Sequence, residues 1–135
     1  VDENVTPYKV AGHRHTPEIE EQLGLQGIVF TPHLLPLDRG ELVSCYATLS
    51  DDPGDLTQLY SDFYADEPFI EIVEHAPGVR EVRDTNFCRI NVCRDERSGK
   101  VLAFGAIDNI WKGSASQAVQ NLNLMFGRPE TEGLL

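Results

Sequence analysis

The order of strand-like and helix-like segments constrains the fold of this chain most, because the two kinds of segment do not alternate strictly. Alternating apolar residues predict a strand over residues 41–50, and shorter apolar runs predict strands over residues 27–31, 69–73, 87–94 and 101–107. The last run is apolar throughout and is expected to be buried on both faces. This order predicts an α+β fold, with a mixed, mostly antiparallel sheet and helices packed on one face.

The first two helices are predicted from their capping residues. Thr16 is expected to cap a helix that has Pro17 at its first position and ends at Gly24. Asp55 follows a turn and is expected to cap the second helix. The apolar stripe of that second helix has helical spacing and consists of Leu56, Leu59, Tyr60, Phe63 and Tyr64.

A third helix is predicted over residues 114–126, with Ser114 as its cap, Gly127 as its end and Pro129 beyond it. Its apolar residues recur at helical spacing, so one face is expected to point inward. The residues of this expected inner face are Ala115, Ala118, Val119, Leu122, Met125 and Phe126.

Composition narrows the class of protein. A chain of 135 residues with 41% hydrophobic and 24% charged residues is expected to form one globular domain. The net charge of −11 argues against binding nucleic acid, which needs a basic face. No apolar run reaches the length of a membrane span and the first residues carry no signal-peptide pattern, so we expect a cytoplasmic location.

The three cysteines are sparse and lack the close spacing of a zinc knuckle, so they are predicted to be reduced thiols. Cys45 falls on the apolar face of a predicted strand, where a cysteine is usually a small buried hydrophobe. We predict the same for Cys88 and Cys93, and none of the three is expected to be a nucleophile.

His13 and His15 are the first candidates for catalysis. If their segment is extended, both rings point the same way, just before the start of a helix. The helix dipole and the charge of Arg14 both disfavour an imidazolium there, which suits a neutral histidine acting as a base or a hydrogen-bond donor near an anion. Two alternatives are surface histidines without a role and a zinc site. Zinc needs further ligands, and since none stands out we expect no metal site.

Arg39 lies in a loop that Pro36 and Gly40 stiffen, and a loop arginine of this kind can bind a carboxylate through two parallel hydrogen bonds. The alternative is a solvated arginine that pairs with Asp38.

Asn109 is the third candidate, since it lies between a predicted strand and a predicted helix, where active-site loops often gather. Its amide offers the donor and the acceptor that a nicotinamide needs, and Gly113 would allow the backbone to approach closely. The alternative is that this segment only caps the helix, with Trp111 in the core.

Four motifs in order along the chain resemble the N-acetyl-γ-glutamyl-phosphate reductase family. They are YKVAGHRHTPEI at residues 8–19, FTPHLLP with the following RG at residues 30–40, DTNFC at residues 84–88, and NIWKGSA with the run to residue 123. The last motif is the most specific of the four. Together they cover nearly the whole chain.

The resemblance implies that residues 1–135 form the substrate-binding and dimerisation domain of such an enzyme, with the fold of semialdehyde dehydrogenase C-terminal domains. Family members also have an N-terminal Rossmann domain that binds NADP, but no G-x-G-x-x-G motif occurs here. The resemblance implies that the 114–126 helix packs on this other domain, so its apolar face is expected to be partly exposed in this chain.

The chemistry that the resemblance implies is an NADPH-dependent reduction of an acyl phosphate through a cysteine thioester. The family's cysteine lies in a Gly-Cys-Tyr-Pro loop, and the Ser-Cys-Tyr-Ala sequence around Cys45 lacks its glycine and proline, so that role does not transfer. The resemblance implies that His13 is the acid/base residue, although His13 and His15 could exchange roles, and that Asn109 contacts the nicotinamide. The residues implied to bind or line the substrate site are Tyr8, Arg14, His15 and Arg39.

The expected partners are a small acyl phosphate, the enzyme's own Rossmann domain and further copies of the chain in a homo-oligomer. Two alternatives stay open. One is a related reductase of lysine or ornithine synthesis that acts on a carrier-linked acyl phosphate. The other is a binding or assembly domain without catalytic activity.

Overall fold

The computed structural model describes residues 2–135 and divides the chain into two compact units after Asp38. The first unit contains β1 (Thr6–Pro7), α1 (Thr16–Leu23) and β2 (His33–Leu34). β1 and β2 form a short antiparallel pair in which Thr6 lies opposite Leu34. Among the described residues, no helix is both long and apolar enough to cross a membrane.

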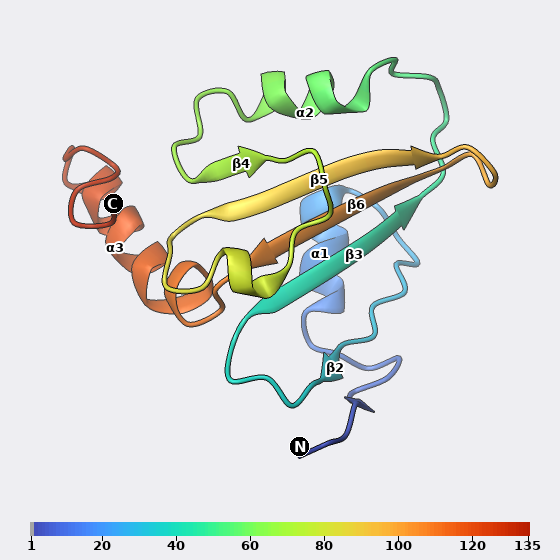
Figure 1. Cartoon of the computed structure of the whole chain (residues 1–135), viewed down its shortest axis with the longest axis horizontal. Helices are drawn as coiled ribbons and strands as arrows, with labels where there is room; N and C mark the ends of the chain where they lie inside the picture. Colours follow the sequence, from blue (N-terminus) through green and yellow to red (C-terminus); the bar gives the residue numbers. More distant parts are fainter. Residues whose placement is uncertain (1) are drawn as a thin grey trace. The chain divides into compact units, whose positions relative to one another are not determined.

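The second unit is built on a four-stranded sheet (Figure 1). Its strands are β3 (Glu41–Ala47), β4 (Ile70–Ile72), β5 (Cys88–Asp95) and β6 (Lys100–Ile107). The order across the sheet is β3-β6-β5-β4. β6 pairs antiparallel with both β3 and β5, and β4 pairs parallel with β5. The predicted mixed, mostly antiparallel sheet is therefore confirmed.

The core of this unit lies between one face of the sheet and α2 (Leu56–Phe63), which runs alongside β4 and β5 in Figure 1. Leu56 is buried in a cluster with Val92 and Val101. Val92 lies opposite Ala103 in the antiparallel register, so the side chains of these two residues point to the same face of the sheet. This is the face that α2 covers, because Val92 packs against Leu56. Tyr60 packs against the same cluster from the next turn of the helix. This packing confirms a helix on one face of the sheet.

The start of α2 depends on the predicted cap, because the Asp55 side chain accepts a hydrogen bond from the Gln58 backbone N–H at 3.0 Å. Asp55→Ala removes that acceptor and should lower the free energy of unfolding by about 1 kcal/mol, measured by urea denaturation. Asp55→Asn keeps an accepting oxygen and should lose clearly less. An equal loss in both variants would contradict the capping role.

The predicted strand over residues 27–31 is wrong, since these residues are irregular and the short β2 forms instead at His33 and Leu34, in a stretch expected to be a loop. The reason is a side chain: Oε1 of Glu20 accepts the backbone N–H groups of Gly27 and Ile28 at 2.7 and 3.0 Å. Two of the backbone donors that a strand would use are thereby already satisfied.

α1 has the predicted position but not the predicted cap. Thr16 is its first helical residue, His15 precedes it, and no side chain caps the helix. Pro17 lies in the first turn as expected, and Gly24 ends the helix in the left-handed conformation at φ 62°.

The last helical segment differs most from the prediction. It begins with a π-helical turn (Trp111–Ala115), which contains Ser114, and continues as α3 (Ser116–Met125), so Ser114 is not a cap. The expected inner face is exposed along its whole length, which agrees with the expectation that the apolar face of this helix is partly exposed in the chain. Ser116 and Asn123 are buried instead, because the Asn123 amide donates to the carbonyl groups of Glu130 and Glu132 and ties the end of the chain to that side of the helix.

The cysteines are less buried than predicted, because Cys45 and Cys93 are exposed and Cys88 is half-buried. Cys45 lies on β3, an edge strand whose seven residues are all exposed. Cys93 follows Val92 and therefore lies on the face of the sheet opposite α2. On the interior strand β6, Val101 and Ala106 are buried and the other residues as far as Ile107 are half-buried, so the expected burial on both faces is met only in part.

Candidate functional site

His13 is the centre of the candidate site in the first unit. Its side chain is largely buried, with 7% of its surface exposed. Three aromatic rings meet it edge to face, with centroid separations of 5.6 Å for Tyr8, 4.8 Å for His15 and 5.1 Å for Phe30. The structure thus brings together Tyr8, His13 and His15, three of the residues predicted to form the site.

A tight turn delivers His13 to this position. The Gly12 backbone N–H donates to the Lys9 carbonyl at 3.1 Å. Lys9 and Ala11 have φ values of 47° and 54°, in the left-handed region that such residues seldom adopt. Strained backbone of this kind persists where the surrounding structure fixes it, and it is common at functional sites.

His13 also connects this turn to α1. Its Nδ1 accepts a hydrogen bond from the His15 backbone N–H at 3.2 Å, and its carbonyl oxygen accepts one from the Thr16 N–H at 3.1 Å. Both donors lie at the start of the helix, where backbone N–H groups have no partner within the helix.

The surroundings of His13 favour the neutral form of its ring. Burial lowers the pKa of His13, and the positive charges of His15, Lys9 and Arg14 lower it further, while Glu18 opposes them. An open groove lies beside the ring, lined by residues 10–13 and 28–31 with Thr16 and Pro17. A neutral histidine at the wall of a groove can exchange hydrogen bonds or protons with a bound molecule.

His15 and Arg14, the other two basic residues of the histidine motif, are both more exposed than His13. The side chain of His15 is half-exposed, and its Nε2 lies 3.9 Å from Oε2 of Glu18. Arg14 is exposed. Within residues 2–135, no three histidine, cysteine or acidic side chains lie close enough together to hold a metal ion.

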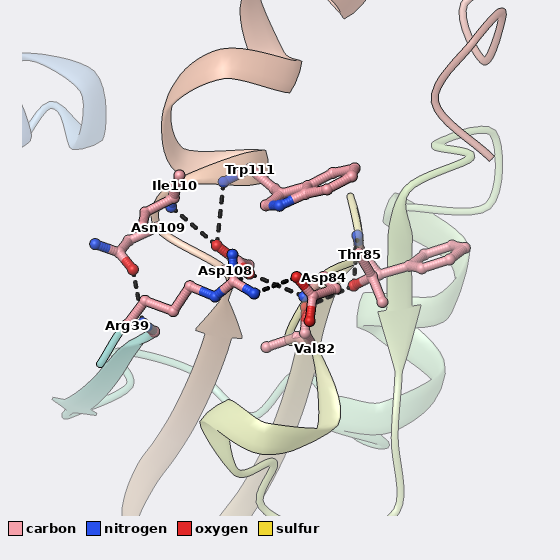
Figure 2. Close-up of polar contacts among 10 residues, drawn as sticks. Arg39, Val82, Asp84, Thr85, Asp108, Asn109, Ile110 and Trp111 are labelled. Atoms are coloured by element: carbon pink, nitrogen blue, oxygen red, sulfur yellow. Dashed lines mark hydrogen bonds and ion pairs between the residues drawn. The ribbon is translucent and has the colours of Figure 1, made fainter. Parts of the chain in front are cut away.

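A second polar cluster, which we call the Asp108 cluster, forms in the second unit where β6 ends (Figure 2). The Asp108 side chain is fully buried. Its Oδ1 accepts the backbone N–H groups of Ile110 and Trp111 at 2.9 and 3.1 Å, and its Oδ2 accepts that of Asp84 at 2.9 Å. This last bond fixes the backbone of Asp84, which has a φ of 60°.

Arg39 completes the cluster. Its Nε lies 3.5 Å from Oδ2 of Asp108, and its Nη2 forms an ion pair and hydrogen bond with the Asp84 carboxylate. The Arg39 side chain is 20% exposed and that of Asp84 is 60% exposed. Pairing of Arg39 with Asp38, the alternative suggested by the sequence, is therefore wrong, because two carboxylates from distant segments take its place.

Asn109 contacts the segment that contains Arg39 and Gly40. Its Oδ1 accepts the backbone N–H of Gly40 at 2.6 Å (Figure 2). Gly40 has a φ of 117°, and a Cβ there would lie 2.6 Å from Cβ of Val79, so only glycine fits. The Asn109 side-chain Nδ2 makes no hydrogen bond to any other residue of the described chain, which leaves both of its N–H donors for a ligand. Trp111 is 41% exposed, so the alternative that places it in the core is wrong.

The sequence did not single out Asp108 and Asp84 as members of the candidate site. The local signal for Asp108 was present, because an aspartate that receives the N–H groups two and three residues ahead is a common start of a helix. The contacts of Asp108 with Arg39 and Asp84 depend on the sheet, and no local pattern encodes them.

The ionised form of Asp108 is stabilised in the folded chain. Burial by itself raises the pKa of this carboxyl, but the N–H donors of Asp84, Trp111 and Ile110, together with the Arg39 guanidinium, outweigh burial and hold the pKa below its ordinary value. The pKa of Asp52 is lowered too, first by the Gly54 backbone N–H and then by the Arg94 side chain. The pKa of Asp95 is lowered first by the Ser98 hydroxyl and then by the Arg97 backbone N–H.

These lowered pKa values predict acid sensitivity. A carboxyl whose pKa is lower in the folded state contributes stability above its unfolded pKa, at about 4, and loses it as the pH falls through the folded pKa. The carboxyl contribution to the free energy of unfolding should therefore be steady from pH 7 to about 5 and should fall at lower pH, while His13, whose pKa is lowered in the folded chain, adds a separate fall below about pH 6.5. Urea denaturation at a series of pH values checks this, and Asp108→Asn should fall less steeply than the parent. A parent as stable at pH 3 as at pH 7 would contradict it.

Curated relatives match nearly the whole chain. Proteins named N-acetyl-gamma-glutamyl-phosphate reductase are 48% identical in Alkalilimnicola ehrlichii and 46% identical in Geobacter metallireducens, each over 99% of this chain. The relative of that name in Moorella thermoacetica is 48% identical over 98% of the chain. The chain spans only about 41–42% of the length of these relatives.

Solved structures and a family profile agree on the fold. The crystal structure of aspartate semialdehyde dehydrogenase II from Vibrio cholerae is 22% identical, with a TM-score of 0.58 over 72% of this chain and 30% of that one. Another structure of it, complexed with ASA, has a TM-score of 0.52 at 20% identity over 69% of this chain and 29% of that one. A profile described as "Semialdehyde dehydrogenase, dimerisation domain" matches residues 1–109. The chain therefore belongs to the family of semialdehyde dehydrogenase dimerisation domains.

Proposed function

We propose that this chain is the substrate-binding and dimerisation domain of an NADP-dependent reductase that converts N-acetyl-γ-glutamyl phosphate to N-acetylglutamate semialdehyde in arginine biosynthesis. The observation that carries the proposal is the 46–48% identity to reductases of this name over nearly the whole chain. The buried, neutral His13 beside a groove supports it, because reduction through a thioester needs a hydrogen-bonding or proton-transferring group next to the reacting carbon.

In this proposal the attacking cysteine belongs to the portion of the enzyme outside this chain, together with most of the NADP site. When bound, NADPH supplies the hydride. His13 acts on the acyl group, and His15 and Arg14 attract the negative charge of the substrate. Tyr8 borders the site through its edge contact with His13. The clustering of positive residues around His13 fits an acyl phosphate, which is an anion.

Arg39 is proposed to bind the substrate carboxylate or phosphate. Its Nη2 is held by Asp84, an exposed carboxylate, and its Nε lies beside the buried Asp108. A substrate anion would exchange with Asp84 while Asp108 keeps the guanidinium in place, since the exposed partner is the easier one to replace. Asn109 is proposed to contact the nicotinamide, and its unused Nδ2 donor fits the carboxamide oxygen of that ring.

We also propose a homo-oligomer in the cytoplasm. The family description names dimerisation, and the edge strand β3 leaves all seven of its residues exposed. The exposed apolar face of α3, with Val119, Leu122 and Met125, is proposed to pack on the NADP-binding portion of the same enzyme, because apolar surface of this kind usually meets a partner.

The test is a chimera. The portion of the Alkalilimnicola ehrlichii reductase that has no counterpart in this chain is joined to this chain, and phosphate- and NADP-dependent oxidation of N-acetylglutamate semialdehyde is measured. We expect an active chimera and no activity from the chain alone. The intact relative is the positive control. A folded chimera that ignores this substrate but acts on a carrier-linked one would replace the proposal with the carrier-linked alternative, and a folded chimera inert with both would favour a non-catalytic domain.

A further inference from the structure

The turn that joins β6 to α3 is wider than a turn of a regular α-helix. It is the π turn Trp111–Ala115, which begins two residues after Asn109. The backbone N–H groups of residues 113, 115 and 116 each donate to the carbonyl five residues earlier, whereas an α-helix spans four. Turns of this kind are rare and are found mostly at functional sites.

The extra residue of the π turn sets the direction in which α3 presents its sides. Each residue of a regular helix turns the chain by about 100°. If the π turn became regular, α3 would therefore rotate by about 100° relative to Asn109. The π turn thus fixes the angle between the Asn109 side chain and the exposed apolar face of α3, to which Val119, Leu122 and Met125 belong.

A side-chain hydrogen bond favours the π turn over a regular one. Lys112 lies within the turn, and its Nζ donates to Oε1 of Gln120 at 2.6 Å. Residues eight apart lie about 80° from each other around a regular helix, but the extra residue of the π turn brings them to the relation of residues seven apart, about 20°. Lys112 and Gln120 therefore lie on nearly the same side of the helix only while the π turn is present.

Both ends of this hydrogen bond are anchored in the second unit. Nζ of Lys112 lies 5.1 Å from the centroid of the Phe69 ring, and Phe69 is fully buried, so the ammonium rests on the core. On the other side, Nε2 of Gln120 donates to Oε1 of Glu130 at 2.5 Å. The three side chains Lys112, Gln120 and Glu130 form one connected series, which we call the Gln120 bracket.

The chain end holds the outer part of the Gln120 bracket. Residues 128–135 fold back beside α3, as the dark red end of the ribbon in Figure 1 shows. The buried Asn123 amide donates to the carbonyl groups of Glu130 and Glu132 at 3.1 and 3.0 Å. The buried Asn86 amide, just before β5, donates to the Leu134 carbonyl. The segment that carries Glu130 is therefore fixed to α3 and to the start of β5.

We infer that Lys112 and Gln120 are positioning residues for cofactor binding, because their bond keeps the π turn and with it the angle between Asn109 and the apolar face of α3. This inference rests on the proposed function, in which Asn109 contacts the nicotinamide and that face packs on the NADP-binding portion. Both contacts form together only if the angle between them matches that portion. Lys112 and Gln120 act through the backbone of the turn and not on the reacting atoms.

The first experiment reads the π turn directly on this chain. NMR couplings across hydrogen bonds identify the carbonyl to which each amide donates. In the parent we expect the amides of residues 113, 115 and 116 to couple to the carbonyls five residues earlier. Gln120→Met keeps the length of the side chain but removes its acceptor and its donor, so these couplings should be lost while those between β5 and β6 remain.

Gln117→Met is the matched control, because it places the same side chain on the same helix. Gln117 is exposed and accepts a hydrogen bond only from Asn121, at 2.9 Å on the exposed surface. This variant should keep all the couplings of the π turn. A Gln120→Met chain that also keeps them, or a Gln117→Met chain that loses them equally, would overturn the inference.

Two variants of Lys112 test the same bond from its other partner, which keeps the test decisive if Gln120→Met does not fold. Lys112→Met removes the donor and the charge and should lose the couplings of the π turn. Lys112→Arg keeps a cation over Phe69 and a donor for Gln120, so it should retain them. Retention in Lys112→Met would overturn the inference.

The second experiment measures the affinity of the chimera for NADPH from the fluorescence of the cofactor. Only the molecules that keep the π turn bind NADPH in full, so Gln120→Met should raise Kd at least about threefold. Gln117→Met should leave Kd unchanged, and the KM for N-acetylglutamate semialdehyde should stay near that of the parent in both variants. A purely structural role would reduce the folded fraction and leave the Kd of the folded molecules unchanged, and that result would overturn the positioning role.

A parent chimera that is folded and does not bind NADPH would count against the proposed function. The NMR couplings are measured on this chain alone and decide whether the Gln120 bracket holds the π turn. The failure of the proposed function and the failure of this inference are therefore distinguishable.

Discussion

Asp108→Ala should lower the free energy of unfolding of this chain by about 3–5 kcal/mol, measured by urea denaturation at pH 7. The side chain is fully buried, and its removal leaves the N–H groups of Asp84, Ile110 and Trp111 without their acceptor. It also leaves the Arg39 guanidinium without its buried counter-charge. Few single side chains in the described part of the chain serve so many partners.

The matched control is Asp84→Ala, which removes an exposed carboxylate from the same cluster. The backbone N–H of Asp84 still reaches Asp108 in this variant, and only the ion pair with Arg39 is lost. An exposed ion pair contributes little, and alanine at the left-handed φ of 60° costs about 1–2 kcal/mol, so this variant should lose clearly less stability than Asp108→Ala. If Asp108→Ala were no less stable than Asp84→Ala, the Asp108 cluster would not have the structural role described above.

His13→Ala in the active chimera should lower kcat by about 10²–10⁴, because it removes the group that acts on the reacting acyl oxygen. Arg39→Ala should instead raise KM with a smaller change in kcat, since its proposed role is to bind the substrate anion. Steady-state kinetics with N-acetylglutamate semialdehyde, NADP and phosphate separates the two effects.

His15→Ala is the control for the assignment of roles within the histidine motif. Its side chain is half-exposed and its neighbour is Glu18, so we expect a moderate rise in KM and a kcat near that of the parent. Normal turnover in His13→Ala together with a large loss in His15→Ala would reverse the two roles.

The sheet of the second unit could be predicted because its signals are local. Alternation over residues 41–47 marks β3, and the tight connection before Lys100 sets β5 and β6 as neighbours. The pairing of β4 with β5 is parallel, and no pattern in three residues reveals that direction. β2 is only two residues long and is defined by its pairing with Thr6 and Pro7, so the residues of β2 alone do not predict a strand.

Helical spacing predicted where the last helix lies but not which side of it is buried. The apolar stripe of Leu122 and Met125 is exposed, and the polar Asn123 is buried by its bonds to the chain end. Periodicity identifies a face, whereas burial depends on what packs against that face.

In the candidate site, sequence patterns can indicate contacts only between residues that are close together in the chain. His13 and His15 are two residues apart, and their ring centroids are 4.8 Å apart, although the segment turns at Arg14 and His15 and is not extended. Arg39 and Asp84 are 45 residues apart in sequence, and Gly40 and Asn109 are 69 apart, so those contacts follow from the fold of the sheet. A single sequence carries no direct record of such pairs.

The Asp108 cluster has a consequence for how the chain opens in solution. Asp108 and Asn109 accept amide hydrogens from Gly40, Asp84 and the 110–111 turn, which belong to three separate segments of the chain. Loss of the β6 end would release all of these amides at once. Their exchange with heavy water should therefore follow a single opening event, which makes the three segments one cooperative unit even though they are distant in sequence.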